Sequence, residues 1–167
     1  PIPDAFIVPT EAFRVAVENL PKQALNALKN GHSDAAHIVT DRLRDGDLFN
    51  PWIDAMGQAY SALGSRAVSA RSSSTAEDLA EASFAGQYET VLNIVDLNRL
   101  VDGIGRVWAS HFSPHAQAYR KRHSVPEEGS AMAVVVQRQI TSRASGVLFT
   151  RDPQSGAKRC VISAALG

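Results

Sequence analysis

Residues 66–75, RAVSARSSST, mark the point at which the pattern of the chain changes. The short, partly apolar run that ends at Arg71 is typical of a strand, and the hydroxyl cluster at residues 72–75 predicts the end of that strand and a polar loop. Before this point apolar residues recur at helical spacing, and after it strand-like runs become frequent. Helices first and strands later predict an α+β fold.

Residues 1–65 carry four helical patterns, which we expect to form a mainly helical N-terminal part. The first begins at Thr10 as a capping residue, and Pro21 precedes the second in a position that a first helical turn tolerates. Ser33 or Asp34 can cap the third. The expected helices cover residues 10–20, 22–30, 34–43 and 51–63.

Residues 66–167 form the second part, in which strands predominate. A strand near residues 89–94 precedes two helices, one starting at Asp96 or Asn98 and one running from Pro114 to about Arg122. The run AMAVVVQRQI at residues 131–140 is nearly continuous and apolar, and predicts a strand buried on both faces. Turns join it to strands at 144–150 and 158–165, so we expect an antiparallel meander.

The composition is that of a globular protein and excludes several functional classes. Lys and Arg number 17, Asp and Glu also number 17, and 44% of residues are hydrophobic. A chain with balanced charge lacks the excess of positive charge that is typical of proteins that bind a nucleic-acid backbone. The longest apolar run is about six residues, far below the roughly 20 of a membrane-spanning helix. The single Cys160 fits a reducing compartment, so we expect the cytoplasm.

The ends of the chain predict that it is an excerpt of a larger protein. The chain begins at Pro1 without an initiator methionine, and it stops at Gly167 directly after a strand-like segment.

Arg71 is the residue whose surroundings in the sequence are best suited to ligand binding. An arginine at a strand end, followed by hydroxyl residues and a loop containing Gly86, offers a fixed fork of donors and close backbone approach, which phosphate oxygens require. The competing interpretation is a capped turn in which Arg71 pairs with Glu77 or Asp78. Local chemistry alone favours that competing interpretation and leaves phosphate binding open.

The other reactive residue types point to structural roles. His111 and His115 have the i, i+4 spacing of a shared helix face, but Pro114 interrupts them and no third metal ligand is placed nearby. Trp52 and Trp108 are expected as core anchors, and Cys160 as an inert small hydrophobe in an apolar strand. Neither a Walker lysine loop nor a dinucleotide glycine fingerprint occurs.

A family resemblance extends what spacing alone can tell. The segments VSARSSSTAEDL at residues 68–79 and EASFAGQYET at 81–90 closely resemble the N-terminal ATP-binding domain of phosphoenolpyruvate synthase, pyruvate phosphate dikinase and rifampin phosphotransferase. Further segments follow in the family's order, so that the resemblance covers the whole chain. These segments lie at residues 1–13, 92–93, 108–112, 119–120, 134–137, 144–153 and 156.

The resemblance implies roles for individual residues. Arg71 resembles the arginine that contacts the nucleotide phosphates and would be catalytic by stabilising charge on the transferring group. Gly86 and Thr90 match the phosphate-covering loop and the strand behind it. Gln137, Gln139 and Ile140 match the strand end that holds the adenine, although family members commonly carry Met where this chain has Gln139.

The resemblance also implies an ATP-grasp fold and a multidomain parent that moves a phosphoryl group from ATP to a histidine on a swivelling domain, and then to pyruvate or another small molecule. The chain would be the first portion of that unit. The Mg²⁺ ligands, the histidine domain and the acceptor-binding domain would lie elsewhere, and this chain alone would be inactive. A rifampin phosphotransferase-like kinase, a non-catalytic nucleotide-binding module and a purely structural fragment are the alternatives.

Overall fold

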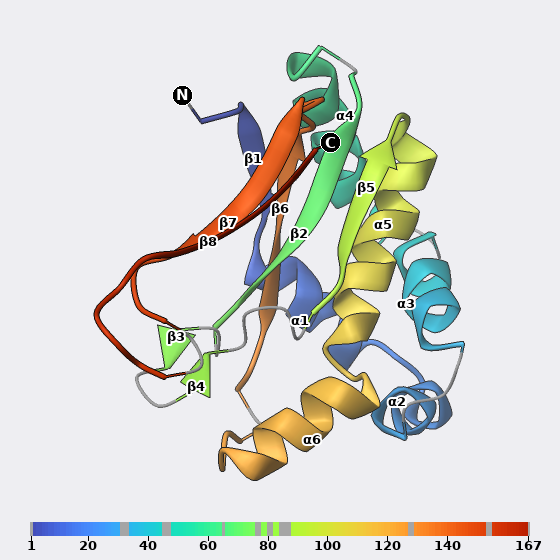
Figure 1. The fold of residues 1–167 in the computed structure, drawn as a ribbon. Coiled ribbons are helices and arrows are strands. Elements are labelled where there is room, and N and C mark those ends of the chain that lie inside the picture. Colours follow the sequence, from blue (N-terminus) through green and yellow to red (C-terminus); the bar gives the residue numbers. More distant parts are fainter. Residues whose placement is uncertain are drawn as a thin grey trace.

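A computed structural model of the chain describes residues 2–30, 34–44, 48–64, 66–75, 78–79, 82–83, 88–126, 129–152 and 155–166. A twisted antiparallel sheet has helices packed against it, and a long hairpin that forms a separate two-stranded sheet crosses in front of it in the view of Figure 1. The helices are α1 (Thr10–Glu18), α2 (Lys22–Lys29), α3 (Ala35–Arg44), α4 (Asn50–Ala62), α5 (Leu97–Ser110) and α6 (Pro114–Arg122). The strands are β1 (Ala5–Val8), β2 (Val68–Ser74), β3 (Asp78–Leu79), β4 (Ala82–Ser83), β5 (Thr90–Ile94), β6 (Met132–Arg138), β7 (Ala144–Phe149) and β8 (Val161–Leu166).

The starts of α5 and α6 follow from local capping. The side chain of Asp96 accepts a hydrogen bond of 2.8 Å from the backbone N–H of Arg99 at the start of α5. Ser113 does the same for Ala116 at 3.2 Å, with Pro114 in the first turn of α6. Both starts confirm the sequence prediction. Thr10 is not the cap that we expected: it is the first residue of α1, and Pro9 occupies the capping position without a side-chain hydrogen bond.

The core lies between the four-stranded sheet and the helices. The strand order is β1-β6-β2-β5, and every neighbouring pair is antiparallel. The central helix α5 packs on the sheet through buried side chains that include Leu100, Ile104 and Trp108. Mixed helices and antiparallel strands confirm the α+β class.

Two strands differ from the sequence prediction. β2 continues through Ser72, Ser73 and Ser74, because its backbone stays paired with β6 as far as Met132; the serines belong to the strand and not to a loop. β6 is not buried on both faces. Val134 and Val136 are fully buried on the helix side, whereas Val135 and Gln137 are only partly buried, because the helices cover one face.

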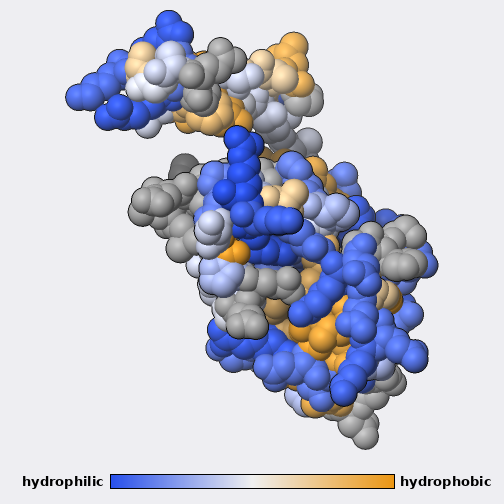
Figure 2. Space-filling model, turned by 90° about the horizontal axis from the view of Figure 1, so that it is seen from below, coloured by the Kyte–Doolittle hydropathy of each residue, from blue (hydrophilic) through white to orange (hydrophobic). Residues whose placement is uncertain are grey.

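The expected three-stranded meander is also corrected. β6 pairs with β1 and β2, and its partner β1 comes from the N-terminal 65 residues, while β7 pairs with β8 in a separate two-stranded sheet. A Cβ on Gly146 would lie 2.5 Å from the carbonyl oxygen of Ser163, so the close approach of the two strands requires glycine. Figure 2 shows the hairpin as the lobe at the top of that view, apart from the main body.

Hydrogen bonds to the side chain of Asp152 stabilise the connection between β7 and β8. Arg159 donates two hydrogen bonds to the buried Asp152 carboxylate, one of them from Nε at 2.8 Å. The same carboxylate accepts from the backbone N–H of Ser155 at 3.3 Å. The turn is therefore fixed by its own residues. Across the described ranges, every helix is too short or too polar to cross a membrane.

Candidate functional site

The face of the sheet turned away from the helices brings predicted site residues together. Arg71 on β2 lies directly opposite Thr90 on β5 and Val135 on β6, and Ser69 lies opposite Gln137. Side chains that are directly opposite, or two positions along a strand, point to the same face. Arg71, Thr90 and Gln137 therefore share this open face.

One end of the open face is hollowed into a cavity of about 420 Å³. This volume falls within the range of small-molecule sites, roughly 300–1,000 Å³. Four of the predicted residues line it: Arg71, Gln137, Gln139 and Ile140. The lining is completed by Pro3, Ser69, Leu92, Arg138, Ser142 and Ser145.

The two further predicted residues are Thr90, which is described, and Gly86, which is not. Thr90 lies on the neighbouring strand, beside Arg71 but outside the cavity wall. Gly86 lies outside the described residues, as does Phe84 in the same loop. The structure thus brings four of the six predicted residues into one cavity, and the phosphate-covering role of Gly86 stays a prediction.

The two arginines of the cavity have different electrostatic surroundings. Arg138 forms an ion pair of 2.9 Å with Asp4 and also contacts the carbonyl oxygen of Leu63. Arg71 is exposed, and among the described side chains no carboxylate lies within ion-pair distance of it. Of its two expected partners, Glu77 lies outside the described residues, and only the backbone of Asp78 is described. Within the described part, Arg71 is the cavity's available cation.

Gln139 lines the cavity, but its side chain forms hydrogen bonds that the sequence did not predict. Its side-chain oxygen accepts a hydrogen bond of 2.7 Å from the backbone N–H of Asn93, and its side-chain N–H donates to Asn93 Oδ1, also at 2.7 Å. Asn93 has a positive φ of 58°. Because the Gln139 amide is occupied by Asn93, it shapes the cavity by linking the end of β6 to the end of β5 across β2.

Asn93 is the residue of this arrangement that sequence reasoning missed. Asparagine is enriched several-fold in the left-handed backbone region, so an Asn at a strand end was an available signal. Its long-range partner Gln139, 46 positions later, was not available from local sequence.

The apolar part of the cavity lies at the same end. Two large aliphatic side chains line it, Ile140, which is 64% exposed, and Leu92, which is 53% exposed. Apolar side chains left uncovered next to polar groups are typical of ligand sites. A cation at Arg71 and an apolar end at Ile140 suit a ligand with a planar apolar portion and an anionic tail.

Other candidates from the sequence are placed elsewhere. His111 is at the C-terminal end of α5 and His115 is on α6, so the two do not share a helix face as their spacing allowed. Cys160 is exposed and lies just before β8, so the expected position within an apolar strand was wrong. Trp108 is buried in the core, as predicted, and Trp52 is partly buried and packs against the core cluster. The described residues contain no cluster of three or more side chains that could hold a metal.

Comparison with known proteins assigns the family. The model of the family described as pyruvate phosphate dikinase, AMP/ATP-binding domain, matches residues 1–167. The chain belongs to this family. The cavity on the open face therefore lies in an ATP-binding domain, and the resemblance noted from the motifs around Arg71 is confirmed.

The curated relatives include rifampicin phosphotransferases and phosphoenolpyruvate synthases. A rifampicin phosphotransferase from a Streptomyces species is 38% identical over 95% of this chain and 19% of its own length. A probable phosphoenolpyruvate synthase from Archaeoglobus fulgidus is 48% identical over 60% of this chain and 13% of its own length. A phosphoenolpyruvate synthase from Aeropyrum pernix is 33% identical over 97% of this chain and 22% of its own length. The chain thus spans about a fifth, or less, of the relatives that it matches.

Proposed function

We propose that this chain supplies the first portion of an ATP-grasp unit, and that the protein containing it moves a phosphoryl group from ATP to a histidine on a swivelling domain and then to a small acceptor. The observation that carries this proposal is the cavity of about 420 Å³ in which Arg71 lies beside the strand end formed by Gln137, Gln139 and Ile140. Residues 1–65 would be its helical part and residues 66–167 its nucleotide-binding part.

Each residue has a physical task in this proposal. The guanidinium of Arg71 would bind phosphate oxygens in a bidentate manner and stabilise the negative charge that builds up during transfer. Ile140 and Leu92 would pack on the faces of the adenine, and backbone groups near Gln137 and Gln139 would meet its polar edge. Thr90 and Gly86 would belong to the strand and the loop over the phosphates.

The residues present fit the nucleotide, while the metal needs ligands from elsewhere. Mg²⁺ bridging the terminal phosphates would neutralise charge there. Since the described residues hold no suitable carboxylate cluster, we propose that its ligands lie outside them. Arg71 would act at the phosphates from the sheet side. A cytoplasmic location is proposed on the basis of the single cysteine.

The acceptor has two candidates, each favoured by a specific relative. Pyruvate is suggested by the phosphoenolpyruvate synthases, and a drug hydroxyl by the rifampicin phosphotransferase, whose match extends over nearly the whole chain. We propose the synthase-like reaction first. Incubating the parent protein with ATP and either pyruvate or rifampicin, and measuring which acceptor becomes phosphorylated, separates the two.

Calorimetric titration of the chain with Mg-ATP tests the nucleotide site itself. We expect Arg71→Ala to weaken binding by about tenfold or more, because it removes charge-assisted hydrogen bonds to phosphate. Arg14→Ala is the matched control, since Arg14 is an exposed arginine on α1 whose partner is Glu11. Equal affinity of wild type and Arg71→Ala would refute the role of Arg71. Binding of Mg-ATP without any transfer by the parent would favour the non-catalytic module.

A further inference from the structure

The pairing of β5 with β2 is irregular beside the nucleotide cavity, the hollow of about 420 Å³ on the open face. Val68 lies opposite Ile94. Two positions along β2, Ala70 lies opposite Val91, so the one residue between them on β2 faces residues 92–93 of β5. Such an extra residue on one strand of an antiparallel pair is a β-bulge, and bulges are frequent next to active sites, where they redirect a side chain. The position of this bulge therefore points to a role in ligand binding.

The bulge changes the alternation of side chains along β5. In a regular strand Val91 and Ile94 would point to opposite faces, because they are three positions apart. Here both approach α5, which runs alongside β5 (Figure 1): a Cβ on Gly103 would lie 2.9 Å from Cδ1 of Ile94 and 3.6 Å from Cγ1 of Val91. The two residues between them, Leu92 and Asn93, are left exposed, and Leu92 lines the nucleotide cavity. The bulge thus lets β5 bury two side chains under α5 and still direct Leu92 to the cavity.

Asn93 and Gln139 hold the bulge in place. Asn93 has a φ of 58°, in the left-handed region that asparagine tolerates better than most residues. Its backbone N–H and its side-chain oxygen are both bound by the Gln139 amide, each at 2.7 Å. Gln139 lines the same cavity as Leu92. One side chain from the end of β6 therefore fixes the part of β5 that carries Leu92.

The bulge and Arg71 mark two different parts of the cavity. Ser69 is the residue of β2 that faces the bulge, and Arg71 lies two positions farther along the strand, which is roughly 7 Å. Leu92 and Ile140 supply apolar surface, whereas Arg71 supplies positive charge. A nucleotide likewise has an apolar base in one part and anionic phosphates in another. Leu92 can therefore act on the base while Arg71 acts on the phosphates.

We propose that the β-bulge at Leu92 and Asn93 is a specificity element for the base of the nucleotide. Leu92 packs on the base, and Asn93 and Gln139 are positioning residues that hold Leu92 against it. The inference rests on the proposed nucleotide site. It adds that the base and the phosphates are recognised by separate devices, so that recognition of the base can be lost while recognition of the phosphates remains.

Calorimetric titration of the chain with Mg-ATP and with Mg-tripolyphosphate, which lacks the base and the ribose, tests the proposal. We expect Gln139→Ala and Asn93→Gly to weaken Mg-ATP binding about fivefold, because each removes hydrogen bonds that position Leu92. Glycine accepts a positive φ, so Asn93→Gly removes the side chain without straining the backbone. Binding of Mg-tripolyphosphate should stay within about twofold of wild type in both variants. Arg71→Ala should weaken binding of both ligands.

Two further variants separate positioning from a general loss of structure. Asn93→Asp keeps an oxygen that can accept the hydrogen bond from Gln139, so it should retain most of the Mg-ATP affinity. Asn98→Ala is the matched control, since Asn98 is an exposed asparagine on α5 outside the cavity lining. It should leave the affinity for both ligands unchanged.

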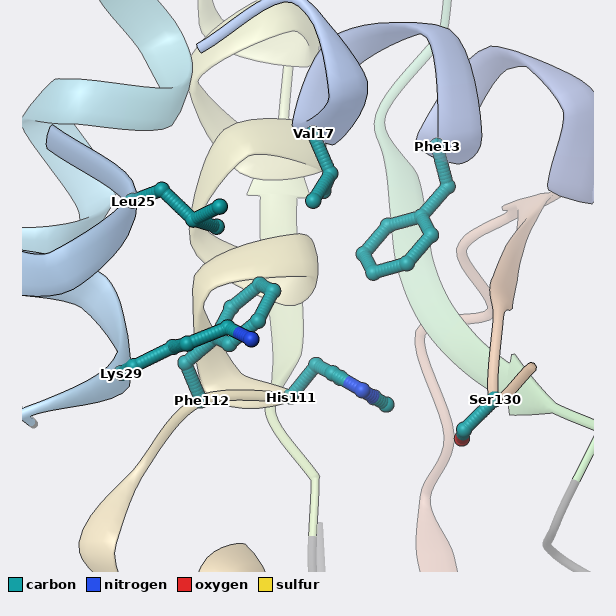
Figure 3. A pocket seen from close by; sticks show the side chains of 7 residues that line it. All are labelled: Phe13, Val17, Leu25, Lys29, His111, Phe112 and Ser130. Atoms are coloured by element: carbon teal, nitrogen blue, oxygen red, sulfur yellow. The ribbon is translucent and has the colours of Figure 1, made fainter. Parts of the chain in front are cut away.

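The methyl signals of Leu92 in NMR spectra give a spectroscopic signature. Mg-ATP should shift them, because the aromatic base lies against the side chain, and Mg-tripolyphosphate should not. The shift at saturating Mg-ATP should be smaller in Gln139→Ala. Val17 and Leu25 provide reference methyl groups, since they line a separate cavity of about 290 Å³ among the helices that shares no lining residue with the nucleotide cavity (Figure 3). Their signals should not move with either ligand.

Several outcomes would overturn the proposal. Gln139→Ala and Asn93→Gly could bind Mg-ATP as tightly as wild type, or they could weaken both ligands by the same factor. Mg-ATP could leave the Leu92 methyl signals unmoved, or Mg-tripolyphosphate could fail to compete with Mg-ATP. Each of these results, with Mg-ATP still bound by wild type, rejects the role of the bulge and leaves the nucleotide site standing. Failure of wild type to bind Mg-ATP would reject the nucleotide site itself and this inference with it.

Discussion

The four-stranded sheet and the β7–β8 hairpin are both antiparallel and rich in apolar residues, yet only one of them forms a core. Val134 and Val136 of β6 are fully buried under the helices. In the hairpin, Leu148 is 57% exposed and Ile162 is 68% exposed. A two-stranded hairpin is at best marginally stable by itself in water, and burial against another layer provides most of the stability of a sheet. An apolar run therefore predicts that a strand forms, but it does not predict whether another layer of the protein packs on that strand.

The largest expected effect contrasts one side chain from each region. Trp108 is 1% exposed and meets Phe13 edge-on at 5.7 Å, so Trp108→Ala should lower the free energy of unfolding by about 3–5 kcal/mol. Leu148→Ala in the hairpin should change it by less than about 0.5 kcal/mol. Urea denaturation of both variants measures the two values. A large loss in Leu148→Ala would show that the hairpin is covered in solution.

The second prediction concerns how pH changes the free energy of unfolding through the buried His111. Burial, reinforced by the charge of Arg120, lowers the pKa of His111 from 6.5 to about 3. The histidine is then neutral in the folded state but protonated in the unfolded state below pH 6.5, so stability falls as pH falls. The pH window of this loss runs from 6.5 down to the folded pKa.

The magnitude follows from linkage. Between pH 8 and pH 5 the His111 contribution should fall by about 2 kcal/mol. Other charged or titratable groups around His111 are Arg120 of α6, Lys29 of α2 and Tyr88, whose ring stacks on it at 6.1 Å. In His111→Leu the fall between these pH values should be smaller by that amount, as measured by denaturation at each pH. An unchanged slope would show that His111 takes up its proton equally in the folded and the unfolded state.

The third prediction concerns close packing between helices. A Cβ on Gly105 would lie 2.2 Å from Oγ1 of Thr40 and 3.2 Å from its Cα, so Gly105→Ala should destabilise the fold by about 1–3 kcal/mol by pushing α3 from α5. In Gly57→Ala the added carbon meets only a side-chain methyl of Leu97, at 3.2 Å. That control should be neutral or slightly stabilising, because alanine favours helix by up to about 1 kcal/mol. Thermal denaturation measures both, and equal effects would contradict the close approach.

The smallest predicted effect lies where the sheet ends and the chain leaves for the hairpin. Gln139→Ala removes both hydrogen bonds to Asn93 and should cost about 1 kcal/mol. Asn93→Ala should cost more, since alanine must adopt a positive φ, and Asn93→Gly should recover that backbone part. A double-mutant cycle isolates the pair. Additive effects of Gln139→Ala and Asn93→Gly would show that the two side chains act independently.

Local sequence predicted the elements well where capping and periodicity agree. Asp96 and Ser113 start α5 and α6 because their side chains satisfy backbone N–H groups within three residues, which is information contained in the local sequence. The motif around Arg71 was specific enough to indicate the family, which the comparisons confirm. Four of the residues named from that motif and from the β6 end line one cavity.

Three of the errors come from pairing or packing between segments that are distant in the sequence. Ser72, Ser73 and Ser74 read as a loop because their hydroxyls favour turns, but pairing with β6 keeps them in the strand. The apolar run of β6 read as buried on both faces, yet helices cover only one. The same pairing, with β1 from the chain start, prevents the meander.

The sequence by itself determined the helices, the caps of α5 and α6, the α+β class and the family, because these depend on short-range periodicity and on a contiguous motif. Only the tertiary structure decided that Arg71 and Ile140 share a cavity, that Gln139 is occupied by Asn93, and that His111 is buried among Phe13, Phe112 and Tyr88. Contacts between residues tens of positions apart depend on strand register and on which face the helices cover. Neither property is encoded in any single stretch of the chain.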